Sequence, residues 1–396
     1  MKIDDLQLKI ILDSRQEKTL EVQMASGNYY VKSSAPQGKS RGEKEASFIP
    51  AEEALEKFQN IKADLVKKEF SSLKEFDNFL IKLDGTPNKS NLGGNLILVL
   101  SMAFCRLQAK EEKKELYQFL REELIHNFPL LDPVLTDYQP PYFFFNVING
   151  GKHSPFGPNF QEYLIVPQTQ NPEESLNLAK IYFAGLKSWF LKNNYPLSYG
   201  DEGGLVFPEK DDEKPLAILK EVRKDLLLDD KIKFSLDAAA STFLKKGDNS
   251  PVDFYLKIID NYQLLSLEDP FHEDDLENFK KLKSLIKDQC FIIGDDLTVT
   301  DANLIEKAIT HQAIDGVIIK PSQKGTITET LEAIGLSLKN QLKIIVSHRS
   351  GETMDDFIAD LSVAANAWGL KSGNITQKER EIKYQRVKKI NDIASR

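Results

Sequence analysis

Residues 291–320, FIIGDDLTVTDANLIEKAITHQAIDGVIIK, carry the pattern from which the fold class can be predicted. The apolar run 291–293 precedes Asp295 and the apolar run 317–319 precedes Lys320, with a helical pattern between them. A continuous apolar run is typical of a strand buried on both faces, as in parallel sheets. The stretch therefore predicts a strand, a helix and a second strand, with an ionisable side chain after each strand.

The same unit recurs along the rest of the chain. From Glu202 onward, 23 to 35 residues separate successive ionisable groups, which is the length of one strand plus one helix. The other runs are 197–199 before Glu202, 234–236 before Asp237, 264–267 before Glu268, 344–346 before His348 and 368–370 before Lys371. We predict an α/β barrel, in which the carboxyl ends of the strands meet at one rim. A doubly wound open sheet would show similar runs but usually has a Gly-rich phosphate turn, which is absent here.

The amino-terminal part has a different pattern. Strand-like runs at 8–12, 19–24 and 28–32 predict an antiparallel meander, and Ala-Ser-Gly at 25–27 separates the last two runs as in a hairpin. Apolar positions at helical spacing follow over residues 51–108. We expect an amino-terminal α+β domain over residues 1–135 and the barrel over residues 136–396.

Composition excludes several classes of protein. The 52 Lys and Arg against 60 Asp and Glu give a net charge of −8, the wrong sign for a nucleic-acid partner. The acidic start lacks the continuous apolar stretch of a secretory signal, so we do not expect export by that route. The longest apolar run, 96–105, is half of the roughly 20 residues that span a bilayer. Two cysteines, Cys105 and Cys290, lack metal or redox spacing, so we expect both to be reduced. We expect a cytoplasmic protein without a membrane partner.

The side chains after the predicted strands suggest a reaction at the rim. Asp237, Glu268 and Asp295 offer oxygen ligands to a hard cation such as magnesium, although an Asp after a strand often only caps the next helix. Lys320 and Lys371 could act as bases, since a lysine beside a cation loses its proton more readily. The stretch that begins at His348, HRSGE, suits an anionic group such as a phosphate.

Six segments together resemble the signature segments of the enolase family. They are LDGTPNK at 83–89, NVINGGKH at 146–153, GDEGG at 200–204, LEDP at 267–270, GDDLT at 294–298 and SHRSGE at 347–352. The similarity extends from about residue 10 to residue 390, in order, so chance is not a serious competitor.

This resemblance implies the reversible dehydration of 2-phosphoglycerate to phosphoenolpyruvate, a step of glycolysis and gluconeogenesis, with two Mg²⁺ ions. The implied fold is a barrel whose second strand is antiparallel and carries Glu162, behind an α+β domain. Asp237, Glu268 and Asp295 would hold the first ion and Ser40 the second. The implied catalytic residues are Lys320 as the base, Glu202 as the acid, Glu162 assisting Glu202, and His348. The implied substrate-binding residues are His153, Gln161, Arg349, Ser350 and Lys371.

The resemblance also implies a homodimer and leaves larger oligomers open. Glu21 and Lys389 stand where the family has an intersubunit ion pair, with Lys in place of the usual Arg. The loop around Ser40 departs from the family, because Lys39 and Arg41 flank the serine. Two alternatives remain at this point: a binding protein on an enolase scaffold, and another acid–base reaction of the superfamily. The anion-binding segment after His348 favours the phosphorylated substrate over that second reaction.

Overall fold

A small sheet and five helices form the amino-terminal domain in the computed structural model, which describes residues 1–396 except 40, 41, 43, 67, 249, 250, 395 and 396. The sheet is the predicted meander, in which β2 pairs antiparallel with both β1 and β3. Leu20, Val22 and Met24 alternate along β2 and are buried, and β2 packs on helix α3. The bounds are β1 (Asp5–Leu12), β2 (Lys18–Ser26), β3 (Tyr29–Ser34), α1 (Ala51–Leu65), α2 (Leu73–Asp84), α3 (Gly94–Glu111), α4 (Leu116–Asn127) and α5 (Asp132–Leu135).

The longest apolar run of the sequence lies in α3, where it forms the core of this domain. Strands β2 and β3 and helices α2 and α4 pack around α3, so it is buried on nearly every side. Helix α2 beside it begins after Ser72, whose hydroxyl accepts from the Glu75 N–H, and ends at Gly85, where φ is 71°. Among the described residues, no helix combines the length and the apolar character that a membrane crossing requires.

The second part of the chain is a closed barrel of eight strands, as predicted. The strands follow the order β4-β5-β7-β8-β9-β10-β11-β12, and β12 pairs again with β4. Strand β5 is antiparallel to both of its neighbours, whereas the other barrel strands pair in parallel. The bounds are β4 (Tyr142–Asn149), β5 (Glu162–Pro167), β7 (Ile232–Asp237), β8 (Leu264–Glu268), β9 (Phe291–Gly294), β10 (Gly316–Ile319), β11 (Lys343–Ser347) and β12 (Gly369–Lys371), with the short β6 (Leu205–Val206) beside β4.

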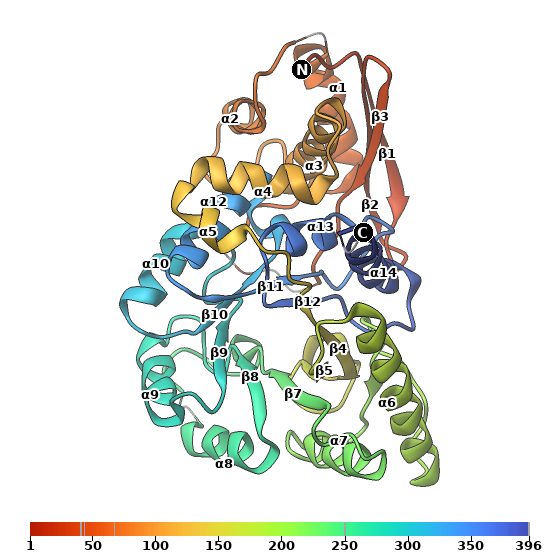
Figure 1. The fold of residues 1–396 in the computed structure, drawn as a ribbon, viewed down its shortest axis with the longest axis vertical. Coiled ribbons are helices and arrows are strands. Elements are labelled where there is room, and N and C mark those ends of the chain that lie inside the picture. Colours follow the sequence, from red (N-terminus) through yellow and green to blue (C-terminus); the bar gives the residue numbers. More distant parts are fainter. Residues whose placement is uncertain (40–41, 43, 67, 249–250, 395–396) are drawn as a thin grey trace.

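Helices surround the barrel, and the amino-terminal domain lies against one side of it (Figure 1). Helix α4 packs on α12 and α13 and so joins the domain to the barrel. The barrel helices are α6 (Pro172–Lys192), α7 (Lys214–Asp225), α8 (Val252–Tyr262), α9 (Leu276–Ile286), α10 (Ala302–Thr310), α11 (Pro321–Lys324), α12 (Ile327–Lys339), α13 (Phe357–Ala364) and α14 (Lys378–Ala394). The described residues also include three short 3₁₀ turns: η1 (Pro129–Leu131), η2 (Gly151–His153) and η3 (Ala240–Thr242).

One end of the barrel interior is apolar. A separate buried cluster lies there, contributed by five strands: Phe144, Leu164, Val166, Ile293, Ile318 and Ile345. This cluster fills the barrel, so the barrel is a packed core with no pore. The ionisable side chains that follow the strands lie at the other end.

The prediction of a barrel strand at residues 197–199 is wrong. Residues 197–199 form no barrel strand, and Tyr199 makes only an isolated bridge to Leu205. Leu197 and Tyr199 are 36% and 49% exposed, so this apolar run is not buried on two faces. Glu202 therefore reaches the rim from a loop beside β4 and does not end a strand of its own.

Candidate active site

Buried charged side chains gather where the barrel strands end. Asp237, Glu268 and Lys371 are the last residues of β7, β8 and β12. Asp295, Lys320 and His348 directly follow the last residues of β9, β10 and β11. Because β5 is antiparallel, its first residue, Glu162, lies at the same rim, paired in register with Asp237. The reversed strand thus adds one more carboxylate to the rim.

Lys371 lies among three of these carboxylates. Its Nζ is 3.1 Å from Asp237 Oδ2, 2.9 Å from Glu268 Oε2 and 3.2 Å from Glu162 Oε1. Burial lowers the pKa of Lys371, but the surrounding carboxylates outweigh burial and the pKa ends above its ordinary value. For Glu268, burial and the nearby Asp237 raise the pKa despite Lys371. The ammonium group therefore balances part of a strongly negative site.

Lys320 forms a further ion pair at the rim, with Asp295. Its Nζ donates to Asp295 Oδ2, and Gln323 Nε2 donates to the other oxygen at 3.0 Å. Burial raises the pKa of Asp295, but Lys320 outweighs it, so the pKa lies below its usual range. Gln161 also belongs to the rim, because its Nε2 donates to Asp237 Oδ2 at 3.3 Å.

Glu202 lies between two histidines. Its Oε1 is 3.3 Å from His153 Nδ1, and its Oε2 is 3.4 Å from His348 Nε2. Asn146 Nδ2 donates to Oε2 at 2.9 Å. No role was predicted for Asn146 from the sequence. Its place as the first residue of the NVINGGKH segment was the feature that could have indicated one.

The carboxyl groups of Glu202 and Glu162 have opposite pKa shifts. Burial raises the pKa of Glu202, but the two histidines outweigh it and hold the pKa well below its usual range. Burial, followed by repulsion from Glu202, raises the pKa of Glu162. Carboxyl groups whose surroundings separate their pKa values are typical of acid and base partners in enzymes. The two residues line one small cavity, together with His153, Lys320, Arg349 and Ser350.

The segment after His348 contacts the amino-terminal domain. Arg349 Nη1 is 2.7 Å from Glu45 Oε2 and 3.1 Å from Ser322 Oγ. Ser350 Oγ accepts from the Lys39 N–H at 2.7 Å. Glu45 is a further residue that the sequence analysis did not single out, and no local pattern marks it. Ser40 and Arg41, in the same loop, lie outside the described residues.

The carboxylates at the rim suit a divalent cation. Asp237 and Glu268 are buried, accept from one Lys371 ammonium and so lie close together, and Asp295 pairs with Lys320 beside them. Within the described residues, two groups bring three ligand atoms within 4.8 Å of one another: His153 with Glu162 and Glu202, and Asp269 with Asp295 and Asp296. The predicted set of Asp237, Glu268 and Asp295 is not one of them. Buried carboxylate oxygens are ligands that Mg²⁺ prefers.

A barrel with buried acidic and basic groups at its carboxyl rim is the architecture of a TIM-barrel enzyme. Two family models divide the chain between them: "Enolase, N-terminal domain" matches residues 3–120 and "Enolase, C-terminal TIM barrel domain" matches residues 137–395. The chain belongs to the enolase family and is a hydro-lyase.

Relatives named enolase are similar along nearly the whole chain. The protein of Methanocaldococcus jannaschii is 34% identical, covering 98% of this chain and 95% of its own length. The protein of Ehrlichia ruminantium (strain Gardel) shows the same identity and coverage. The protein of Sulfurisphaera tokodaii is also 34% identical, covering 96% of this chain and 93% of its own.

Proposed function

We propose that this protein catalyses the reversible, magnesium-dependent dehydration of 2-phosphoglycerate to phosphoenolpyruvate in glycolysis and gluconeogenesis. The observation that carries the proposal is the cavity in which Lys320 and Glu202 meet the anion-binding pair Arg349 and Ser350. A base and an acid from different elements can act on neighbouring carbons of one small substrate. Membership of the enolase family supports the same reaction.

The proposed roles are those that membership of the enolase family implies, assigned to the residues of this chain. Lys320 removes the proton from the carbon next to the substrate carboxylate. Glu202 delivers a proton to the leaving hydroxyl, and Glu162, whose raised pKa favours holding a proton, assists it. His348 acts beside Glu202, with its Nε2 3.4 Å from Glu202 Oε2. His153, Gln161, Arg349, Ser350 and Lys371 bind the substrate, whose phosphate and carboxylate suit the cationic and hydroxyl donors.

Magnesium fits this site as the cofactor. Asp237, Glu268 and Asp295 would hold a first ion, and the loop that contains Ser40 would meet a second. Bound magnesium supplies positive charge that stabilises the doubly charged carboxylate formed when the proton leaves. Lys371 also places a positive charge at the site, where its Nζ lies within 3.2 Å of three carboxylates.

The test is the formation of phosphoenolpyruvate from 2-phosphoglycerate, followed by absorbance, with magnesium and with a chelator. We expect turnover that the chelator abolishes and added magnesium restores. The Lys320→Ala variant, with a folded circular-dichroism spectrum, should be inactive under the same conditions. Absence of turnover in the unaltered protein at saturating magnesium would contradict the proposal and favour the binding-protein alternative.

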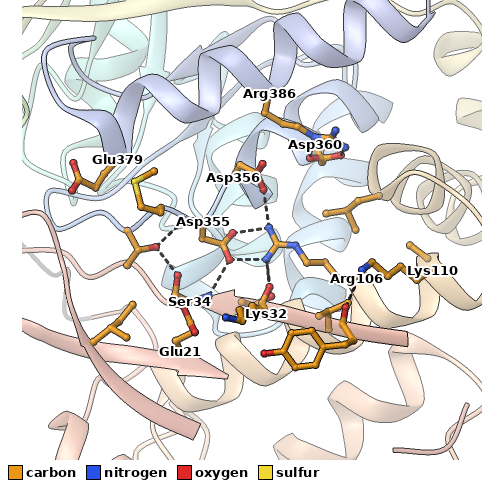
Figure 2. A pocket seen from close by; sticks show the side chains of 18 of the residues that line it. Glu21, Lys32, Ser34, Arg106, Lys110, Asp355, Asp356, Asp360, Glu379 and Arg386 are labelled. Atoms are coloured by element: carbon orange, nitrogen blue, oxygen red, sulfur yellow. Dashed lines mark hydrogen bonds and ion pairs between the residues drawn. The ribbon is translucent and has the colours of Figure 1, made fainter. Parts of the chain in front are cut away.

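We also propose that the protein is a homodimer, joined through a groove between the amino-terminal domain and the barrel. This cavity of about 750 Å³ is larger than the one at the rim and lies apart from it. In Figure 2, Arg106 joins Asp355 and Asp356, and Glu21 is another of the side chains that line the groove. The large apolar side chains that line it while exposed are Leu12, Tyr30 and Met354.

A second copy of the chain suits this groove better than a small ligand. Exposed apolar side chains beside charges of both signs can contact the same surface of a second copy, as in a two-fold interface.

We place the domain boundary between residues 135 and 136, in the connection from α5 to β4. We propose the cytoplasm as the compartment, because Cys105 and Cys290 are both buried and free.

A further inference from the structure

Arg380 is a fully buried arginine near the start of α14. Its side chain is 0% exposed, and its guanidinium donates to five acceptors, none of which is a carboxylate. The acceptors are Gln377 Oε1 at 2.6 Å, the carbonyl oxygens of Ser350 at 2.9 Å, Asp201 at 3.0 Å and Arg349 at 3.3 Å, and His348 Nδ1. A buried arginine usually pairs with a carboxylate, so charge neutralisation does not explain this one.

The structure leaves room for Arg380 at a specific glycine. A Cβ atom at Gly373 would lie 2.5 Å from Arg380 Cδ, and Gly373 has a φ of 68°. The guanidinium thereby reaches two loops of the rim at once, one at Asp201 and one at residues 348–350. These loops contain Glu202, His348, Arg349 and Ser350, so Arg380 holds together residues proposed to act on the substrate.

The contact with His348 determines where the imidazole carries its proton. A guanidinium has N–H donors and no acceptor, so His348 Nδ1 must offer its lone pair to Arg380. A neutral imidazole with an unprotonated Nδ1 carries its proton on Nε2. That nitrogen lies 3.4 Å from Glu202 Oε2. The proton therefore points toward the carboxylate of Glu202.

We propose that Arg380 is a positioning residue for the dehydration: it holds His348 as a neutral imidazole whose Nε2–H is directed at Glu202. The inference rests on the proposed function of Glu202 as the acid. His348 then presents an N–H group to Glu202 and does not compete with Glu202 for the transferred proton. An imidazolium would place an N–H group against the Arg380 N–H and two positive charges in contact.

The charged groups around His348 have opposing effects on its pKa. Burial lowers the pKa of His348 to about 3, Glu202 acts to raise it, and Arg380 and then Lys371 lower it. These groups come from the loop at Glu202, from α14 and from β12. The neutral form is thus favoured at physiological pH by two cations and by burial against one carboxylate.

Nitrogen NMR of the full-length protein labelled with ¹⁵N-histidine tests the proposal without substrate. The chain has five histidines, and the signals of His348 are those lost in His348→Gln. We expect a single neutral tautomer protonated on Nε2, with no titration from about pH 5 to pH 8. A proton on Nδ1, or an imidazolium in this range, would overturn the proposal before any arginine is altered.

Two variants then separate positioning from simple packing. Arg380→Met removes the donor, and we expect His348 to populate both tautomers and to titrate at higher pH. We expect kcat to fall at least about tenfold, with a smaller change in KM and a shifted pH profile of kcat. Arg380→Lys keeps a cation that can donate, and it should restore part of the Nε2–H population.

Arg121→Met is the matched control. Arg121 also donates to three backbone carbonyls, those of Leu135, Val363 and Ala364, but contacts none of the proposed site residues. It should leave the His348 signals and the pH profile unchanged. If Arg380→Met matches this control in both readouts, Arg380 has only a structural role. A lack of 2-phosphoglycerate turnover in the unaltered protein would contradict the proposed function and leave the tautomer result standing.

Discussion

Glu45 and Arg349 form a two-pronged ion pair that joins the amino-terminal domain to the barrel rim. Arg349 Nη1 lies 2.7 Å from Glu45 Oε2 and Nη2 lies 3.2 Å from Oε1, and both side chains are 6% exposed. Glu45 Oε1 also accepts from the Gly42 N–H at 3.1 Å. One carboxylate therefore anchors the described part of the loop to an arginine that we propose binds the substrate.

The first prediction concerns this ion pair. Glu45→Ala leaves a buried guanidinium without its carboxylate partner, and we expect the free energy of unfolding to fall by about 3 kcal/mol. Urea denaturation measures this change. Glu52→Ala is the control, because Glu52 pairs with Lys18 at the exposed surface and its loss should be barely measurable. Equal effects of the two substitutions would show that burial of the Glu45 pair is unimportant.

A second prediction separates the proposed base from the proposed acid. Glu202→Gln cannot deliver a proton to the leaving hydroxyl, so net dehydration should fall by on the order of 10²-fold or more. Lys320 still removes the carbon-bound proton, so exchange of that proton with heavy water should continue. Lys320→Ala should lose both reactions. Proton NMR of 2-phosphoglycerate in heavy water measures exchange, and equal loss of exchange in both variants would contradict separate roles.

The third prediction is a pH dependence of stability caused by Asp77. This carboxyl group is fully buried on α2 and accepts from the Thr328 N–H at 2.9 Å, near the start of α12. Burial raises the pKa of Asp77 to about 6 from the ordinary 3.8. Between these values the unfolded chain loses the proton first, so the folded state becomes relatively less stable as the pH rises.

Asp77→Asn keeps an acceptor for Thr328 and cannot ionise. Its stability relative to the unaltered protein should therefore improve by up to about 3 kcal/mol between about pH 4 and pH 7. Urea denaturation at both pH values provides the measurement, with the exposed Asp225→Asn as the control. A constant difference between Asp77→Asn and the unaltered protein would mean that Asp77 keeps an ordinary pKa in the fold.

A fourth prediction tests the homodimer. Glu21 pairs within its own chain with Lys9 at 2.9 Å, and in the proposed dimer it also meets Lys389 of the second copy. Lys389→Glu places a negative charge beside Glu21 there, so the dissociation constant should rise at least about tenfold. Lys388→Glu is the control on the same helix, since Lys388 pairs within its own chain with Asp392 at 3.3 Å. Sedimentation at micromolar concentration distinguishes the states. A monomeric unaltered protein would contradict the dimer.

Much of the fold could be predicted because the pattern of buried strands is local. Six apolar runs followed by ionisable residues became barrel strands β7 to β12, and the meander lies where the three strand-like runs predicted it. Residues 197–199 show the limit of this reasoning. A short apolar run indicates hydrophobicity but does not show whether a partner strand lies beside it.

The site divides in the same way. The sequence by itself determined which ionisable groups follow the strands, since their order along the chain sets their place on the rim. Only the tertiary structure decided what each group contacts: Glu45 meets Arg349 across 304 residues, and Arg380 meets His348 across 32. Contacts between distant segments also set the burial and the neighbouring charges, on which the pKa values of Glu162 and Glu202 depend. Two glutamates of the same chemistry thus acquire opposite tendencies to hold a proton, because folding gives one a histidine pair and the other a repelling carboxylate.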